Sequence, residues 1–362
     1  MKKTIASVLA TLAASSLAIA SDGTPDTANQ FPAAGAYYEY FVYLTPGELP
    51  EVAFAEESCS GSLIAPKVLM TAAHCTAYNY TIDIGIAGYY DLAWVTFDLR
   101  ATGNDFRCFL VEQGVAYTEF MTADYGCDPA AKSVPFPTFL PAAIAGRNDG
   151  VPIAHGLTHP GYLREGLRHD GRATPVNWNL LRQPDVGAVI LVDAVTGIDP
   201  LPLRAVGELD TIEGIVGTPV VSVGYGLNWT KLYGEKPTKG IGPQTDLGGG
   251  NEVKRIARLG PIKNLFENSL VPRQDIKKGD DVVCFGDSGS PLFLERDGVV
   301  EPAIAAVLSG ATNWCQGSMD PYYRIDRREA QEFLQCVIAN QDDVAAACRN
   351  CSAEADLGLC EE

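Results

Sequence analysis

The chain of 362 residues is 46% hydrophobic and carries 27 basic against 45 acidic residues, a formal net charge of −18 at pH 7. It is long enough for one large or two modest globular units with a full hydrophobic core. An acidic surplus of this size argues against nucleic acid and anionic membranes as partners.

The N-terminal end has the pattern of a secretory signal. Two lysines precede an apolar stretch at residues 5–17, and residues 18–20 offer small side chains for cleavage. A membrane anchor is the alternative, but the stretch is shorter than the roughly 20 residues that a spanning helix needs. We therefore expect a signal peptide over residues 1–20 and a secreted, extracellular protein. Three glycosylation sequons fit an exported chain, and they begin at Asn79, Asn228 and Asn350.

Short apolar runs separated by Gly, Pro and Asp follow the signal. This spacing predicts many short strands and few helices, as in a β-sandwich or barrel. The clearest runs are Ser62–Ile64, Val68–Thr71, Val186–Val192, Ile215–Val223 and Ala303–Leu308. The string Arg296-Asp297-Gly298, between two apolar runs, predicts a hairpin.

A helix is predicted near the C-terminal end, over about 326–339. Asp326, with Glu329 three residues later, is a candidate N-terminal cap. Apolar residues fall on one face at helical spacing, namely Ala330, Phe333, Leu334, Val337 and Ile338.

Ten cysteines in an exported chain predict disulfides rather than metal ligands. Cys108 and Cys127 lie in a long segment, about 95–150, and we expect them to pair with each other. Four more stand at the C-terminal end, namely Cys336, Cys348, Cys351 and Cys360. These four allow three pairings, among which the sequence does not choose. Zinc is the alternative, but no histidine lies among them, so we expect neither a metal nor another cofactor.

Two strings far apart in the chain carry candidate catalytic chemistry. Thr71-Ala72-Ala73-His74-Cys75 supplies a histidine, and Gly286-Asp287-Ser288-Gly289-Ser290-Pro291 supplies a serine in a tight glycine-flanked turn. A hydroxyl is a poor nucleophile at neutral pH, so a serine enzyme needs an imidazole base within hydrogen-bond reach. Both strings, in this order, resemble signatures of the chymotrypsin/trypsin family of serine endopeptidases.

The resemblance covers residues 22–339 in pieces and implies an all-β fold. It implies two antiparallel six-stranded β-barrels, trypsin-like, with a C-terminal helix, a long insertion in the first barrel and a Cys-rich tail. The expected divisions are a trypsin-like peptidase domain at 21–340, barrel 1 at about 31–200, the insertion at about 95–150, barrel 2 at about 201–323 and a Cys-containing extension at 341–362.

The resemblance also assigns catalytic roles. His74 is the expected base and Ser288 the nucleophile, with the N–H groups of Gly286 and Ser288 forming the oxyanion hole. Asp185 opens an apolar run, where a charge needs a partner, and resembles the acid that orients the imidazole. Asp193 is the alternative acid, but it follows that run instead of leading it.

The strings around the catalytic residues imply disulfides and contain departures from the family pattern. Cys59-Ser60-Gly61-Ser62-Leu63-Ile64 resembles the family's Cys-Gly-Gly-Ser-Leu-Ile strand, which implies a Cys59–Cys75 disulfide beside the base. Cys284 and Cys315 are implied to frame the primary specificity pocket. Ser290 stands where family members usually have a second glycine.

The primary pocket is expected to favour an apolar or small side chain before the scissile bond. Val282 occupies the position at which trypsin-like members place the aspartate that holds Arg or Lys. Asp320 could restore basic specificity if it pointed inward; a turn position is the alternative. Ser309 resembles the serine that supports the acid and lines the cleft. The candidate substrate-binding residues are Val282, Val283, Phe285, Ser309, Gly310 and Asp320.

Asp287 is a candidate partner for the chain's N-terminus. In the family, this carboxylate pairs with a freshly exposed N-terminal ammonium. The family's Ile-Val-Gly-Gly start is missing here, but cleavage after Ala18 would expose Ile19. We hypothesise that signal removal or light trimming yields Ile19.

Together these residues imply a secreted serine endopeptidase that acts on polypeptides through an acyl-enzyme and is open to proteinaceous inhibitors. The alternative is a catalytically silent homologue that acts as an extracellular binding module, although all three triad residues are present. An esterase of the α/β-hydrolase type is disfavoured because its chain order is Ser, acid, His.

Overall fold

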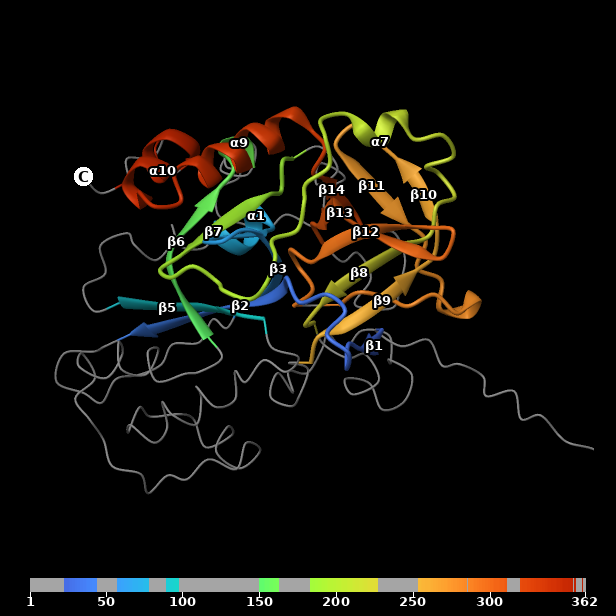
Figure 1. Ribbon diagram of the computed structural model, residues 1–362, viewed down its shortest axis with the longest axis horizontal. Coiled ribbons are helices and arrows are strands. Elements are labelled where there is room, and N and C mark those ends of the chain that lie inside the picture. The colour runs from blue at the N-terminus through green and yellow to red at the C-terminus, as the bar shows by residue number, and fades with distance from the viewer. Residues whose placement is uncertain are drawn as a thin grey trace, which may run out of the picture.

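The computed structural model describes residues 23–43, 57–77, 89–97, 150–162, 183–226, 253–284, 286–310 and 320–353, with residues 355 and 360. Two β-structured units lie side by side, and the C-terminal helices cover one end of the first (Figure 1). The signal region, most of the expected insertion, Cys108 and Cys127 lie outside the described residues. No helix within the described part is long and apolar enough to cross a membrane.

The first unit is a closed, antiparallel six-stranded barrel with the strand order β2-β3-β4-β7-β6-β5. Its strands are β2 (Ala34–Tyr43), β3 (Glu57–Ala65), β4 (Val68–Thr71), β5 (Tyr89–Thr96), β6 (Gly150–Thr158) and β7 (Gly187–Leu191). Every residue of β4 and β7 is buried, because the barrel interior covers one face of these strands and neighbouring elements cover the other. The first predicted barrel is confirmed.

The second unit is an antiparallel sheet with the order β1-β9-β8-β12-β13-β14-β11-β10. Its strands are β1 (Thr24–Pro25), β8 (Val220–Gly224), β9 (Arg255–Leu259), β10 (Ile262–Leu265), β11 (Ser269–Pro272), β12 (Pro291–Arg296), β13 (Val299–Leu308) and β14 (Tyr322–Arg324).

The chain itself closes this second sheet. β9 pairs with β8 toward one end and β10 pairs with β11 at the other, yet only Gly260 and Pro261 separate β9 from β10. Pro261 has no N–H for a ladder hydrogen bond, and a Cβ on Gly260 would lie 2.5 Å from Asp280 Oδ2. With β9 and β10 taken as one bent strand, and the short β1 set aside, the unit has the six strands that the all-β prediction requires.

The predicted hairpin is confirmed. Arg296 pairs with Val299, and the loop residues Asp297 and Gly298 have φ angles of 54° and 75°. Positive φ at both loop residues is the mark of a type I′ turn, which matches the twist of the flanking strands. The apolar run Ile215–Val223 is a strand only in its second half. The strand begins only at Val220, because Gly217 turns the chain with a φ of 102°.

The C-terminal helix α9 (Arg328–Ala339) is confirmed. Four of its five predicted apolar residues are buried, and Ile338 is half-buried against the same cluster. The predicted cap is wrong, because the N-cap is Arg327 and makes no side-chain cap hydrogen bond. The Asp326 carboxylate is instead bonded to Arg324.

The tail folds into a second helix, α10 (Val344–Cys351), which the sequence did not predict. Asp343 caps it, because Asp343 Oδ1 accepts the Ala346 N–H at 2.9 Å. Disulfides join Cys336 to Cys351 and Cys348 to Cys360. The alternative zinc site is therefore wrong. Cys348 and Cys351 belong to the same buried cluster as residues of β4 and β7, so the tail packs on the first barrel.

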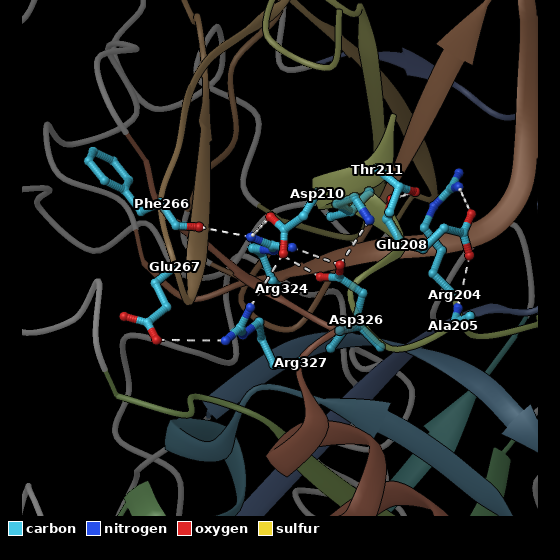
Figure 2. Close-up of polar contacts among 12 residues, drawn as sticks. Arg204, Ala205, Glu208, Asp210, Thr211, Phe266, Glu267, Arg324, Asp326 and Arg327 are labelled. Atoms are coloured by element: carbon cyan, nitrogen blue, oxygen red, sulfur yellow. Dashed lines mark hydrogen bonds and ion pairs between the residues drawn. The ribbon is translucent and has the colours of Figure 1, made fainter. Parts of the chain in front are cut away.

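A buried arginine forms hydrogen bonds that connect three segments of the second unit. Arg324, at the end of β14, is 1% exposed and lies among acidic and carbonyl oxygens (Figure 2). Its Nε and Nη2 donate to both oxygens of the buried Asp326 at 2.8 and 2.7 Å. Its Nη1 donates to Asp210 Oδ1 in the short helix α7 (Glu208–Thr211) at 2.8 Å and to the carbonyl of Phe266 at 3.0 Å. Asp326 Oδ2 also accepts the Leu209 N–H, so the network leaves no oxygen of that carboxylate without a donor.

Replacing Arg324 with methionine is expected to destabilise the protein by about 3–5 kcal/mol, because it leaves the Asp326 carboxylate buried and unpaired. Chemical denaturation at neutral pH measures this loss. Arg258→Gln is the matched control, since Arg258 is exposed and its ion pair with Glu295 is expected to contribute at most about 1 kcal/mol. Equal losses in the two variants would contradict the prediction.

Candidate active site

His74 is held by elements of the first barrel. It lies in the one-turn helix α1 (Ala73–Thr76), which follows β4 directly. The neighbouring Cys75 is joined to Cys59 of β3, as expected. The sulfur atoms of this disulfide and a ring nitrogen of His74 all lie within 4.8 Å of one another. Because the two sulfurs are bonded to each other, the group offers no thiolate to a metal, and its effect is to fix the position of the imidazole.

The Asp185 carboxylate contacts both the imidazole ring and the backbone N–H of His74. The distance from His74 Nδ1 to Asp185 Oδ2 is 2.9 Å, and the His74 N–H donates to Asp185 Oδ1 at 2.9 Å. The Asp185 side chain is fully buried, and Ser309 Oγ donates a further hydrogen bond to its Oδ2. Asp193, the alternative acid, is exposed. A carboxylate against Nδ1 favours the neutral tautomer that carries its proton on Nδ1, and Nε2 is then the basic nitrogen of the ring.

The loop that carries Ser288 lies directly against the first barrel. The Ser288 carbonyl accepts the N–H of Ser60 in β3 at 2.7 Å, and the Gly289 N–H donates to Leu308 at the end of β13 at 2.9 Å. Gly289 has a φ of 81°, and a Cβ there would lie 2.1 Å from Thr71 Oγ1. Glycine is therefore required for the close approach of this loop to the strand that leads into His74.

Ser288 is half-buried, and its Oγ makes no hydrogen bond within the described part of the chain. Catalytic hydrogen bonds are often long before substrate binds, so this geometry does not remove Ser288 as a candidate. The N–H groups of Gly286 and Ser288 likewise have no acceptor within the described part of the chain. Two such donors on one tight turn, with Gly286 at a φ of 88°, suit a site for a developing oxyanion.

Asp287 is buried beneath this turn. Its Oδ1 accepts the Gly226 N–H at 2.9 Å and its Oδ2 accepts the Cys284 N–H at 2.8 Å. Gly224 and Gly226 make room for it, because a Cβ at either would lie within 2.2–2.4 Å of the carboxylate. Burial raises the pKa of the Asp287 carboxyl to about 6, although the two backbone donors partly oppose this shift. The hypothesised partner, Ile19, lies outside the described residues.

The raised pKa of Asp287 makes stability depend on pH. A carboxyl whose pKa is higher in the folded than in the unfolded chain binds its proton more tightly when folded. The resulting stability is present below about pH 4 and is lost as pH rises through about 6. Over this window the protein is expected to lose up to roughly 3 kcal/mol relative to an Asp287→Asn variant.

Urea unfolding of both proteins at several pH values measures this difference. A slope of the opposite sign would contradict the prediction. It would also indicate a cationic partner for Asp287, such as an N-terminal ammonium, because a neighbouring positive charge lowers the pKa of a carboxyl.

The predicted pocket residues are brought together only in part. Val282 and Val283 are each 1% exposed, and Asp320 is 2% exposed. Ser309 Oγ donates to Asp185, and the Ser309 N–H donates to the carbonyl of Pro321 at 3.0 Å, next to Asp320. Gly310 is half-buried beside it. Cys284 is disulfide-bonded, whereas Phe285 and Cys315 lie outside the described residues.

Two serines that stand where the family has glycine both have partners. Ser290 is fully buried, and its Oγ lies 3.0 Å from Ser222 Oγ on the adjacent strand β8. Ser60 is also fully buried and contacts the Ser288 loop through its backbone and its hydroxyl. The only sequence signal at Ser60 is its place at a glycine position of the strand motif, and that signal alone points to no role.

The strand order defines an all-β fold of two antiparallel units, a closed six-stranded barrel and a sheet that the bend between β9 and β10 closes. The sequence matches no protein-family model and no curated protein. Among solved structures, one described as "Structure of GrC" aligns with 88% of this chain and 98% of its own length, at 16% sequence identity and a TM-score of 0.44. A likeness at this level carries no argument about activity.

Proposed function

We propose that the protein is a secreted serine endopeptidase. The observation that carries this proposal is the cluster formed by His74, Asp185 and Ser309, with the Ser288 loop hydrogen-bonded onto the strand beside it. This arrangement suits acyl transfer, in which a base activates a hydroxyl and backbone N–H groups stabilise the oxyanion.

In the proposed reaction, Ser288 Oγ attacks the carbonyl carbon of the scissile peptide bond while its proton passes to His74 Nε2. Asp185 stabilises the imidazolium that forms, and the N–H groups of Gly286 and Ser288 receive the oxyanion. The imidazolium then protonates the leaving amine. A water molecule, deprotonated by His74, hydrolyses the acyl-enzyme and regenerates the serine.

We further propose polypeptides as substrates, with an apolar or small residue before the scissile bond. The buried valines Val282 and Val283 support this preference, because neither offers a charge to a basic side chain. The alternative is an extracellular binding module without catalysis. The intact contact between His74 and Asp185 disfavours it. Peptide binding alone would not distinguish this module from a peptidase, because both would bind peptides.

A serine-directed fluorophosphonate probe tests the proposal. The expected result is a single covalent adduct on the folded, secreted protein, mapped by mass spectrometry to Ser288 and absent after denaturation. Cleavage of a varied peptide library by the same preparation then defines the residue before the scissile bond. Peptide binding by folded protein without an adduct or cleavage would favour the binding module.

A further inference from the structure

Ser60 lies at the junction between the first barrel and the nucleophile loop. It belongs to β3, next to the cysteine whose disulfide supports the base, and it is fully buried. Its N–H donates to the Ser288 carbonyl at 2.7 Å, and its Oγ donates to the Gly286 carbonyl at 2.9 Å. The same Oγ accepts the Tyr225 N–H at 3.0 Å, and the Ser60 carbonyl accepts Thr71 Oγ1 at 2.8 Å. Every polar group of this residue is therefore in use.

We propose that Ser60 is a positioning residue that holds the oxyanion hole in its working geometry. The inference rests on the proposed peptidase function. It assigns to the Ser60 hydroxyl a task that no glycine at this position could perform, namely fixing the carbonyl of Gly286. The backbone N–H of Ser60 fixes the carbonyl of Ser288 in parallel.

The backbone of the loop explains why such anchors matter. Gly286 has no Cβ and a φ of 88°, so its own conformational preferences do little to fix the neighbouring peptide groups. Each peptide group is planar, so a hydrogen bond to its carbonyl orients the whole group. Ser60 anchors the peptide group after Gly286 and the one after Ser288. The peptide group that carries the Ser288 N–H lies between these two, so its orientation is restricted from both sides.

The hydroxyl of Ser60 serves two buried backbone groups at once, as donor to the Gly286 carbonyl and as acceptor from the Tyr225 N–H. If Ser60 were alanine, the Gly286 carbonyl would lose this donor and the Tyr225 N–H would lose its acceptor at a buried position. Unsatisfied buried groups are costly, so the loop would be expected to rotate toward other partners. Such rotation would turn the oxyanion donors away from the cleft while leaving His74 and Asp185 in contact.

The test compares Ser60→Ala with Ser62→Ala. Ser62 lies two residues further along the same strand, is also fully buried, and its hydroxyl has no hydrogen-bond partner among the described residues. Loss of one oxyanion donor costs about 100- to 1000-fold in kcat, so loss of its anchor is expected to cost about tenfold, with KM within about twofold of the original value. Ser62→Ala is expected to change neither value.

A second readout separates positioning from general loss of structure. A peptide aldehyde adds to Ser288 Oγ as a hemiacetal whose oxygen occupies the oxyanion site, whereas a non-covalent peptide inhibitor does not engage that site. Ser60→Ala is expected to weaken aldehyde binding by about the same factor as kcat and to leave binding of the non-covalent inhibitor unchanged. Ser60→Thr, which keeps a hydroxyl, is expected to recover most of both losses.

The outcomes distinguish this inference from the proposed function. If the unaltered protein forms no fluorophosphonate adduct on Ser288, the peptidase function fails. If it does form the adduct, but Ser60→Ala matches Ser62→Ala in kcat and aldehyde affinity, the positioning role fails alone. Should Ser60→Ala not fold, Ser60→Gly takes its place, because glycine also keeps the N–H to Ser288 and removes the hydroxyl together with its Cβ. Full activity in Ser60→Gly would overturn the proposal.

Discussion

Replacing Ser288 with alanine is expected to lower kcat for peptide hydrolysis by about a million-fold, with little change in KM. The reason is that His74 would have no hydroxyl to activate, whereas the substrate-binding surfaces would be unaltered. The residual rate, still above that in water, would come from the donors of Gly286 and residue 288. Single-turnover hydrolysis of the best library peptide, at enzyme concentrations from below to above KM, measures both constants.

The same experiment with His74→Ala tests whether the two residues act as a unit. Nucleophile and base depend on each other, so the double variant is expected to be no slower than either single variant. Multiplied losses in the double variant would mean that each residue acts alone and would contradict the proposed mechanism. Retention of most activity in Ser288→Ala would contradict it outright.

Local strings allowed most of the candidate site to be predicted. The histidine and serine motifs resemble family signatures in the family's chain order, so His74 and Ser288 could be singled out without a structure. Asp185 followed from a charge at the start of a buried run, and the structure brings its carboxylate to the His74 ring at 2.9 Å. The Cys59–Cys75 disulfide was implied by the resemblance of the strand motif to that of the peptidase family, and the structure contains it.

Contacts between distant segments could not be predicted in this way. Asp326 had the spacing of a helix cap, but Arg324, two residues earlier, binds its carboxylate at both oxygens and leaves the helix without a side-chain cap. The capping pattern does not include the contacts that hold Arg324 in place, which come from Asp210 in α7 and from the carbonyl of Phe266, both far along the chain. Likewise, composition alone left three pairings for the tail cysteines, and only the packing of α10 on α9 selects one.

The proposed role of Ser60 also depends on a contact between distant segments, which the sequence alone does not show. Its departure from glycine was visible in the strand motif, but the partner of its hydroxyl, Gly286, lies in the other barrel and far along the chain. A buried serine in a strand is usually explained by a neighbouring carbonyl of the same sheet. The hypothesis of a functional role for the serine in place of glycine rests on the contacts between the Ser288 loop and β3.

Replacing Asp185 with asparagine is expected to lower kcat by about ten-thousand-fold while leaving the fold intact. Three donors converge on this carboxylate, namely the backbone N–H of His74, His74 Nδ1 and the hydroxyl of Ser309. An amide places an NH₂ group against at least one of them. The ring can relieve that clash by moving its proton from Nδ1 to Nε2, which removes the acceptor that Ser288 needs.

Asp193→Asn is the matched control, because Asp193 is the exposed alternative acid in the same segment, and it is expected to leave kcat unchanged. Ser309→Ala should cost less than Asp185→Asn, since it removes one donor to the carboxylate and leaves the charge in place. Thermal unfolding of each variant checks that loss of rate is not loss of structure. Equal activity in Asp185→Asn and Asp193→Asn would show that the contact between Asp185 and His74 does not orient a catalytic base. The proposed triad would then lose its acid, whatever the distance between the two side chains.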